Sequence, residues 1–400
     1  MKKIAIIGFG VVGSGVYEII RKNKDILTKK CAEEIDVKRI LDIRDFSSHE
    51  EASLFTKDFN DLLEDEEISI VVETMGGIKY AYDYTKALLE AGKSVVTSNK
   101  ELVAAHGDEF FRIAKEKNVR YLYEASVGGG IPIIRPLAND ASANDIEEIS
   151  GILNGTTNYI LTKMFKENDS FEKALKTAQE LGYAEKDPTA DVDGIDACRK
   201  ISILMSLVTG KKFDSNKVNT IGIREITAED VTYAAAIGCT IKLIGHGFTK
   251  EGRANASVEP MLIPESCPLS GVEDVFNGVL VKGNMVGELM FYGRGAGKLP
   301  TASAVVGDVI DIVRSPQYNS YFTWEKCDGE DVIPYEEVEA RFFVRITEDK
   351  KDKVKAIFGD TEIIKGVSDY GFVTEKMSVA DLEKGIEALG GIVSRIRLYR

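Results

Sequence analysis

The sequence predicts an α/β protein built from an N-terminal doubly wound parallel sheet, a second α+β domain and a C-terminal βαββαβ unit. Over the first 135 residues, short apolar runs alternate with longer amphipathic stretches, a pattern typical of βαβ units in a parallel sheet. After Pro136 the pattern changes to longer helical stretches followed, from about Ala254, by strand-like alternation, which favours a mixed or antiparallel sheet. A chain of 400 residues also favours two or three domains, at roughly 100 to 200 residues each.

The N-terminal domain is expected to span residues 1–135. Its strands are predicted at Lys3–Ile7, Val37–Ile43, Ile68–Glu73, Ser94–Thr97 and Val119–Glu124. Helical patterns fill the intervals, so the strands should run parallel and end at one edge of the sheet. That carboxyl edge is where doubly wound sheets bind ligands.

The second domain is expected at 136–314 and a turn-rich linker at 315–339. Its helices are predicted at Thr156–Phe165, Phe171–Leu181 and 194–209, and its strands at Ala254–Met261, Val279–Lys282 and Glu288–Gly293. A helical pattern at 296–314 is a candidate to pack back on the first domain. The last unit, 340–400, is predicted as strands at 340–346, 362–367, 370–377 and 393–397, with helices at 350–357 and 380–389.

Composition and charge exclude several classes of protein. With 44% hydrophobic and 29% charged residues the chain is not disordered, and its net charge of −14 disfavours nucleic acid and membrane surfaces as partners. Five cysteines without a CxxC pair favour a reducing cytoplasm. The apolar run Ile4–Val16 superficially resembles a signal peptide, but no small-residue cleavage site follows it. We therefore expect a soluble, cytoplasmic protein.

A complete GxGxxG motif directly follows the first predicted strand. It consists of Gly8, Phe9, Gly10, Val11, Val12 and Gly13, and a helical pattern begins at Ser14. In dinucleotide-binding sheets the first glycine makes the turn, the second lets a pyrophosphate approach, and the third lets helix and strand pack closely. The context favours an NAD- or NADP-binding site over an ordinary strand-to-helix turn.

The end of the second strand carries both an acid and a base. Asp42 would favour NAD by binding the ribose hydroxyls, whereas Arg44 could stack on adenine or hold a 2′-phosphate. A solvated strand end is about as good an interpretation. The choice between NAD and NADP therefore stays open.

Two lysines stand in positions that suit hydride-transfer chemistry. Lys100 follows Thr97 and Ser98 at the carboxyl end of a predicted parallel strand. Lys200 and Asp196 share one face of the predicted helix at i, i+4 spacing. A partly desolvated lysine can take the proton of an alcohol and return it to an alkoxide. An ordinary surface ion pair is the alternative.

The loop before Lys200 is crowded with acids. Glu185, Asp187, Asp191 and Asp193 lie within nine residues, and close like charges are costly unless they meet a cation such as a substrate ammonium group. A calcium loop is the competing interpretation, but the spacing does not match an EF-hand.

Other nucleophiles and bases have weaker support. His49, His106 and His246 are expected to be solvated or structural. Cys198 could support a covalent thioester mechanism, but its mid-helix position without a nearby histidine favours a packed, inert thiol.

Taken together, the chain resembles homoserine dehydrogenase over nearly its whole length. The likeness is carried by GFGVVGSGV, VVTSNKELVA, EASVGGGIPIIRPL, GILNGTTNYIL, LGYAEKDPTADVDGIDACRK and GRGAGKLPTASAVVGDV. The resemblance implies reversible NAD(P)-dependent hydride transfer between L-homoserine and L-aspartate 4-semialdehyde, in the biosynthesis of threonine, methionine and isoleucine from aspartate. It also implies a Rossmann-type N-terminal domain and a substrate and dimerisation domain.

The resemblance also implies roles for individual residues. Lys200 would be the general acid and base, Lys100 a second essential lysine at the cofactor and substrate junction, and Asp196 would lie beside the reacting oxygen. Glu185 and Asp191 would hold the substrate ammonium group. Gly155 and Thr156 would bind substrate, and Gly297 would lie in the loop Gly293–Gly297 that closes over the cofactor. A sodium ion would be bound by four residues: Glu124, Val127, Gly129 and Ile131. For Gly128–Gly130, simple turn chemistry is the alternative to a role in the sodium site.

The C-terminal unit resembles an ACT domain, a module that in this family is often associated with threonine feedback. Where such modules usually have an Asp-x-x-Gly turn, this chain has Glu348-Asp349-Lys350-Lys351. Binding of an effector such as threonine and a purely dimerising role are both open, and the resemblance implies a homodimer or homotetramer. The alternatives for the whole chain are a related dehydrogenase of another amino or hydroxy acid and a non-catalytic dinucleotide-binding sensor.

Overall fold

The computed structural model describes residues 1–317, 323–364 and 369–400, and the chain forms two compact units. Unit 1 consists of Met1–Asn144, Ser202–Asp214 and Gly293–Lys326. Unit 2 consists of Asp145–Ile201, Ser215–Tyr292 and Cys327–Arg400. Within the predicted linker and the predicted strand 362–367, residues 318–322 and 365–367 lie outside the described ranges. Over the part of the chain that is described, no helix has the length and apolarity needed to span a membrane.

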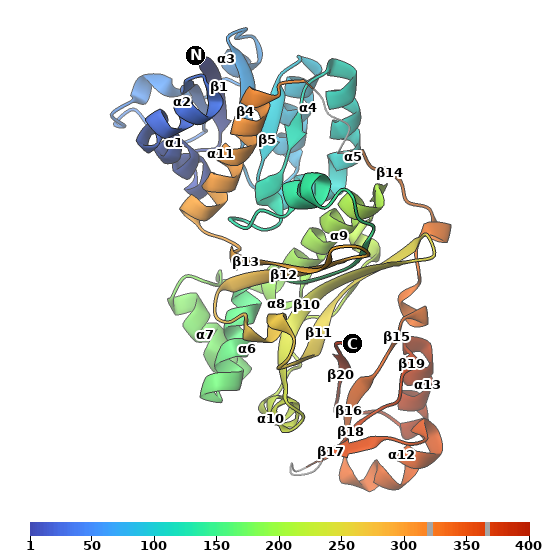
Figure 1. The fold of residues 1–400 in the computed structure, drawn as a ribbon. Helices are drawn as coiled ribbons and strands as arrows, with labels where there is room; N and C mark the ends of the chain where they lie inside the picture. Colours follow the sequence, from blue (N-terminus) through green and yellow to red (C-terminus); the bar gives the residue numbers. More distant parts are fainter. Residues whose placement is uncertain (318–322, 365–368) are drawn as a thin grey trace. The chain divides into compact units, whose positions relative to one another are not determined.

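Unit 1 contains a parallel sheet with the strand order β3-β2-β1-β4-β5-β6. This order is the one typical of dinucleotide-binding sheets, so the predicted fold class is confirmed. Figure 1 labels β1, β4 and β5 of this sheet. The strands are β1 (Lys2–Ile7), β2 (Ile35–Leu41), β3 (Phe55–Thr56), β4 (Ile68–Glu73), β5 (Ser94–Thr97) and β6 (Tyr121–Leu122). The helices are α1 (Val11–Lys22), α2 (Lys24–Cys31), α3 (Asn60–Leu63), α4 (Lys79–Glu90), α5 (Lys100–Lys117) and α11 (Lys298–Arg314).

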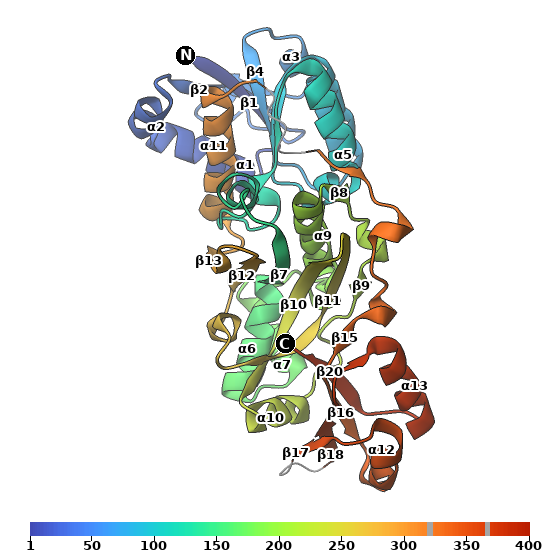
Figure 2. The ribbon, with the colours of Figure 1, turned by 45° about the vertical axis from the view of Figure 1, so that its right-hand side comes forward.

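Helix α11 packs beside α1 in unit 1, although the two helices lie far apart in the sequence (Figures 1 and 2). A Cβ on Gly15 of α1 would lie 2.9 Å from the Lys298 carbonyl oxygen and 3.0 Å from the Ala302 Cβ. Lys298 also pairs with Glu18 at 2.8 Å. A glycine at position 15 is therefore what lets the two helices approach closely.

Three strands of unit 1 differ from the sequence prediction. Strand β2 lies at Ile35–Leu41, two residues earlier than the predicted Val37–Ile43. Strand β3 is only two residues long and follows an acidic stretch, so no alternating pattern announces it. The strand predicted at Val119–Glu124 is shortened to Tyr121–Leu122 because the chain turns at Glu124, whose backbone N–H donates to the Asp308 carboxylate at 2.9 Å.

Unit 2 is organised around a sheet with the strand order β13-β12-β7-β10-β11-β20-β16-β18-β17. Strands β7, β10, β11 and β12 pair antiparallel. Alternating patterns predicted strands within β11 and β12, whereas β7 was not among the predicted strands. These strands are β7 (Ile146–Ile152), β10 (Cys239–Lys250), β11 (Arg253–Pro264), β12 (Phe276–Gly283) and β13 (Gly287–Arg294). The helices are α6 (Gly155–Glu167), α7 (Phe171–Glu180), α8 (Thr189–Val192), α9 (Ile195–Thr209, which continues into unit 1) and α10 (Ala228–Ala236).

The described residues of 340–400 follow the predicted βαββαβ succession and join the sheet of unit 2 (Figure 2). The elements are β16 (Phe342–Ile346), α12 (Lys351–Phe358), β17 (Glu362–Ile364), β18 (Tyr370–Val373), α13 (Val379–Leu389) and β20 (Ser394–Leu398). Phe342, Phe358, Phe372 and Leu382 lie in its core. Strand β20 pairs parallel with β11, so one continuous sheet connects this region to the rest of unit 2.

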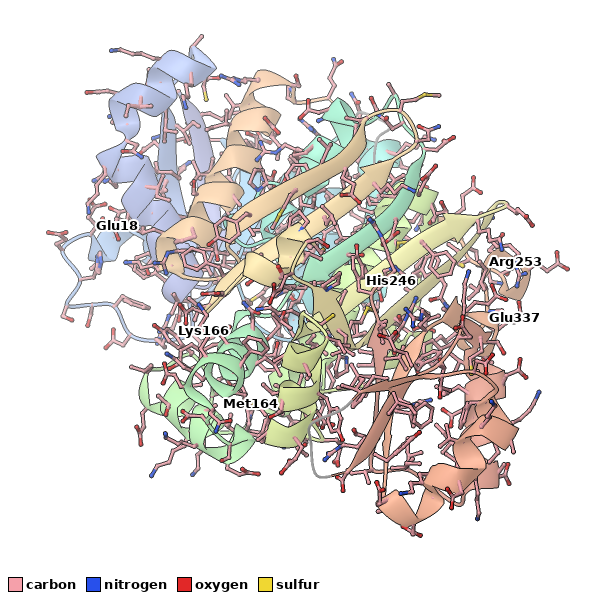
Figure 3. All side chains as sticks on the ribbon, turned by 60° about the horizontal axis from the view of Figure 1, so that its bottom comes forward. Glu18, Met164, Lys166, His246, Arg253 and Glu337 are labelled. Atoms are coloured by element: carbon pink, nitrogen blue, oxygen red, sulfur yellow. The ribbon has the colours of Figure 1, made fainter. Side chains whose placement is uncertain are left out.

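Short pairs of strands complete the two units. These are β8 (Lys211–Lys212) with β14 (Glu325–Lys326), β15 (Glu339–Ala340) with β19 (Met377–Ser378), and β9 (Asn219–Thr220) with β11. In Figure 3, Arg253 and Glu337 lie next to each other, and their charged groups are 3.6 Å apart. This ion pair holds the segment before β15 against the start of β11.

Candidate active site

Lys200 lies on the first turns of α9 in unit 2 and is almost completely buried. Its Nζ donates to the Asp196 carboxylate at 2.8 Å and to the Leu153 carbonyl at 2.7 Å. Only 8% of Lys200 and 5% of Asp196 are exposed. The i, i+4 spacing predicted from the sequence therefore produces a buried pair. An exposed pair would contribute little, whereas a buried one is held in a single geometry.

Asn154 connects this pair to the strand that precedes it. It follows β7 and Leu153, and its Oδ1 caps α6 by accepting the Thr157 N–H at 2.9 Å. Its Nδ2 donates to Asp191 at 2.7 Å and to Asp196 at 2.9 Å. One asparagine thus ends a strand, begins a helix and bridges the two carboxylates beside Lys200.

The acids of the loop before α9 have separate roles. Asp187 accepts from the backbone and hydroxyl of Thr189, and Asp193 pairs with Arg224. Asp191 is half-buried and turns toward Asn154, whereas Glu185 is exposed. The crowding of acids in the sequence is therefore relieved in part by Arg224 and Thr189, and does not require a substrate cation at every carboxylate.

Gly155 and Thr156 form the first turn of α6 next to Asn154. Thr156 donates its hydroxyl proton to the Tyr183 carbonyl at 2.7 Å, which holds the acidic loop against α6. A Cβ on Gly155 would lie 2.8 Å from the Val275 carbonyl, so only glycine fits here without a shift. Asn154, which immediately precedes this turn, bonds to Asp191 and to Asp196, the partner of Lys200.

The glycine motif in unit 1 has the geometry expected for a dinucleotide. Gly8 adopts φ +86°, and a Cβ on Gly13 would lie 1.9 Å from the Gly8 carbonyl oxygen. A Cβ on Gly10 would meet no described atom within 4 Å, and Val11 beside it is 67% exposed. Helix α1 begins at Val11 without a side-chain cap from the described residues. The backbone of this turn is therefore not covered by side chains of the described residues at the N-terminus of α1, a position where a pyrophosphate binds favourably.

Asp42 and Arg44 at the end of β2 form one bonded unit. The Asp42 carboxylate accepts the Phe9 N–H at 2.7 Å and two bonds from the Arg44 guanidinium at 2.8 and 2.9 Å. The Arg44 side chain, followed by burial acting in the opposite direction, holds the pKa of Asp42 well below its usual range. Arg44 remains 56% exposed at its side chain and lies over the Phe46 ring.

Thr97, Ser98 and Lys100 follow β5 at the carboxyl edge of the parallel sheet. Thr97 donates to the buried Glu73 carboxylate at 2.5 Å, and the Ser98 N–H donates to the Glu73 carbonyl at 3.4 Å. Lys100 is the first residue of α5 and is half-buried. The structure thus places these three residues at one strand end, as predicted.

Two glycine-rich loops of unit 1 meet closely. A Cβ on Gly129 would lie 2.1 Å from the Gly295 carbonyl, and the Gly130 N–H donates to Arg294 at 3.0 Å. Gly297 has φ +120° and precedes α11. The segment around Gly297 is therefore fixed by its contact with the 128–130 turn.

The Glu124 carboxylate, one of the expected sodium ligands, is already bonded to other groups of the protein. The two Glu124 oxygens accept from the backbones of Ile133, Ile134 and Arg135 and from the Arg135 guanidinium, at 2.6 to 3.2 Å. These bonds use about all the lone pairs that a carboxylate offers. The Glu124 side chain does not fit a cation. Among the described residues, no group of three or more His, Cys, Asp and Glu side chains is arranged to hold a metal.

The alternative nucleophiles and bases are occupied elsewhere. His246 lies on β10 (Figure 3), contacts Glu148 at 3.3 Å, and has its pKa lowered chiefly by burial. Cys198 is buried and its thiol lies 3.2 Å from the Ser215 carbonyl. Neither arrangement forms a nucleophile and base pair.

Two residues of these networks were not singled out from the sequence. Asn154 stands in the capping pattern Asn-Gly-Thr-Thr at a strand-to-helix junction, which was a usable signal. Glu73 is an acid at the last position of a largely apolar strand, at the same carboxyl edge of the sheet that drew attention to Lys100.

The fold of unit 1 and the buried lysine and aspartate of unit 2 define an NAD(P)-dependent oxidoreductase. Comparison with known proteins specifies the family. The model for "Homoserine dehydrogenase, NAD binding domain" matches residues 8–124, and the model for "Homoserine dehydrogenase" matches residues 132–310. The chain belongs to the homoserine dehydrogenase family.

Individual relatives agree with this assignment. The homoserine dehydrogenase of Bacillus subtilis is 41% identical over 317 residues, covering 78% of this chain and 73% of that protein. The crystal structure of a homoserine dehydrogenase from Thiobacillus denitrificans superposes with a TM-score of 0.92 at 36% identity, over 99% of this chain and 98% of that one. A hyperthermophilic archaeal homoserine dehydrogenase in complex with NADPH matches at TM-score 0.67 and 31% identity, over 79% and 99%. The protein is an oxidoreductase with an NAD(P) cofactor.

Proposed function

We propose that Lys200 is the group that moves the hydroxyl proton in the interconversion of L-homoserine and L-aspartate 4-semialdehyde. This assignment rests on the buried hydrogen bond that the Lys200 amine donates to the Asp196 carboxylate at 2.8 Å. Burial favours the neutral amine and Asp196 favours the ammonium form, so the two effects together set a working protonation equilibrium. The neutral amine accepts the proton of the homoserine hydroxyl, and the ammonium form returns a proton to the developing alkoxide. The bound nicotinamide supplies or accepts the hydride.

The amino-acid end of the substrate is assigned to the residues around Asn154. Asp191 and Glu185 supply negative charge for the ammonium group, and Asn154 fixes Asp191. The first turn of α6, at Gly155 and Thr156, presents backbone N–H groups that suit the carboxylate. Asp196 holds Lys200, with Asn154 bonded to it.

The cofactor is assigned to the carboxyl edge of the unit 1 sheet. The pyrophosphate is assigned to the turn Gly8–Gly13, and the adenosine ribose to Asp42 and Arg44. The nicotinamide end of the cofactor is assigned to Thr97, Ser98 and Lys100. Gly297 lies in the loop that closes the site. Because Asp42 is occupied by Phe9 and Arg44, and Arg44 carries an exposed guanidinium, we infer that NADP is accepted at least as well as NAD.

The C-terminal βαββαβ region is proposed as an ACT-like module that binds an amino-acid effector such as threonine. Its sheet continues into β11, so a change there can be transmitted to the substrate-binding sheet. A purely dimerising role is the second candidate. Calorimetric titration of the whole chain with L-threonine tests the first, because absence of heat and of inhibition would leave only the second.

We also infer a homo-oligomer in the cytoplasm, supported by the family and by five cysteines that are all free in the described structure.

The decisive experiment for the chemistry is steady-state turnover of L-homoserine with NAD and NADP side by side. Lys200→Ala should lower turnover by about 10³-fold while the dissociation constant for cofactor stays unchanged. Turnover by Lys200→Ala at the wild-type rate would contradict the assignment.

A further inference from the structure

Glu73, the last residue of β4, is fully buried at the carboxyl edge of the unit 1 sheet. Its carboxylate accepts the Met75 N–H at 2.7 Å on one oxygen and the Thr97 hydroxyl at 2.5 Å on the other. A charge removed from water is costly unless hydrogen bonds compensate it. Burial, only partly offset by these two bonds, raises the pKa of Glu73 to about 7.

The hydrogen bonds of Glu73 lead to both loops that follow β4 and β5. The Thr97 hydroxyl oxygen accepts the Asn99 N–H at 2.9 Å, so its own proton points to Glu73. Asn99 then donates to the Gly77 carbonyl at 2.7 Å and caps α5 at the Leu102 N–H. Through this chain, Glu73 connects the 74–78 loop to the turn at 98–99 and to the start of α5, where Lys100 stands.

The residue after Glu73 extends the same network to the glycine motif. The Thr74 hydroxyl lies 2.7 Å from the Gly8 carbonyl and 3.0 Å from the Ile7 carbonyl. Three strand ends that border the dinucleotide site are therefore linked around one buried carboxyl group. An apolar side chain could fill the same space, but it could not accept these bonds.

We propose that Glu73 is a positioning residue whose ionised carboxylate holds the loops after β4 and β5 in their cofactor-binding arrangement, so that its protonation weakens NAD(P)H binding. The inference rests on the proposed placement of Thr97 and Lys100 on the nicotinamide side. The ionised carboxylate accepts both bonds at once. An added proton turns one of the two oxygens into a neutral hydroxyl, which is a much weaker acceptor, so the bond to that oxygen loses its charge assistance and is weakened.

The pKa shift of Glu73 comes from burial, partly offset by its bonds to Thr97 and Met75. Tyr121 of β6 is an ionisable neighbour that feels the charge of Glu73. Burial, followed by the charge of Glu73, raises the pKa of Tyr121 well above its ordinary value. Tyr121 therefore stays neutral between pH 6 and pH 8.5, where Glu73 changes its charge.

The test compares NADPH dissociation constants of the wild type and Glu73→Gln from pH 6 to pH 8.5, by quenching or enhancement of fluorescence. The ratio of the two constants cancels the titration of NADPH itself. Glutamine cannot accept both bonds, so the variant should bind weakly at every pH. The wild type should match it at pH 6 and bind on the order of 10-fold more tightly at pH 8.5, the effect of one charge-assisted hydrogen bond. A ratio that does not change with pH would overturn the proposal.

A second readout separates positioning from simple packing. A carboxyl group whose pKa is raised on folding stabilises the folded state at low pH, and this stability is lost as the pH rises through the folded value. At pH 8.5 Glu73→Gln should therefore have a melting temperature at or above that of the wild type while binding NADPH less tightly. Parallel loss of both would indicate a packing role and contradict the proposal.

Thr97 provides the matched pair of variants. Thr97→Ser keeps the hydroxyl and should retain the pH-dependent ratio, whereas Thr97→Val should lose it. If the wild type failed to bind NADPH at any pH, the cofactor assignment itself would be wrong, a result distinct from a pH-independent ratio.

Discussion

The two sites of this protein are built in opposite ways. The lysine site of unit 2 consists of buried polar side chains that hold one another: Lys200, Asp196, Asn154 and Asp191. The glycine site of unit 1 depends on side chains that are missing at Gly8, Gly10 and Gly13. The first should therefore fail when atoms are removed, and the second when atoms are added. Substitutions can test this contrast directly.

The largest effect is expected for removal of the Lys200 amine. Lys200→Ala should lower kcat about 10³-fold, within the usual contribution of general acid and base catalysis. Steady-state kinetics with homoserine and NADP measure it, and cofactor titration serves as the control. Lys200→Arg keeps the charge but cannot release a proton, so it should be nearly as inactive. An active arginine variant would show that charge alone suffices.

Addition of one methyl group separates two glycines of the cofactor turn. Gly13→Ala places a Cβ 1.9 Å from the Gly8 carbonyl, so it should lose cofactor binding and about 3 kcal/mol of stability, the upper range for overpacking. Gly10→Ala meets open space and should keep its melting temperature while binding NADPH more weakly. Thermal denaturation and fluorescence titration distinguish the two, and equal melting temperatures would contradict the geometry.

A smaller effect is expected at Asn154, where capping and bridging coincide. Asn154→Ala should lower kcat/KM for homoserine roughly 10-fold, because Asp191 and Asp196 each lose a buried donor. Loss of the α6 cap should also cost about 1 kcal/mol. Ser170 is the control, because it caps α7 but, in the described structure, is not bonded to Asp191 or Asp196 as Asn154 is. Ser170→Ala should cost similar stability in chemical denaturation without changing kcat/KM, and a similar kinetic loss there would assign the Asn154 effect to capping.

The smallest effect concerns cofactor choice at Arg44. Arg44→Ala should reduce kcat/KM for NADP by about 5-fold and leave that for NAD nearly unchanged, since an exposed arginine contributes modestly to phosphate binding. Kinetics with both cofactors measure the change in their ratio. Lys22, paired with Glu18 on α1, offers a control because its removal also subtracts one surface charge. Equal losses with both cofactors would remove Arg44 from the phosphate site.

The sequence predicted the parallel sheet well because local signals were strong. Apolar runs marked β1, β4 and β5, and the glycine motif marked the turn between β1 and α1. The i, i+4 spacing also anticipated the bond between Lys200 and Asp196. These features depend on residues close together in the chain.

Features made by distant residues were not predictable in the same way. The two-residue β3 carries no periodic signal, and β20 joins β11 through pairing that no local pattern specifies. The bridge from Asn154 to Asp191 and Asp196 spans 37 and 42 residues. Arg224, which neutralises Asp193, lies 31 residues away. Such partners become visible only when the fold brings them together.

The packing of α11 on α1 has a consequence for synthesis of the chain. The Gly15 face of α1 is made early, but the helix that covers it begins only at Lys298. At typical translation rates of about 5–20 residues per second, this face waits on the order of 10 to 60 s for its partner. During that interval the nascent N-terminal sheet exposes an apolar helix face on the ribosome. Chaperones should therefore be able to bind this protein between the emergence of α1 and that of α11.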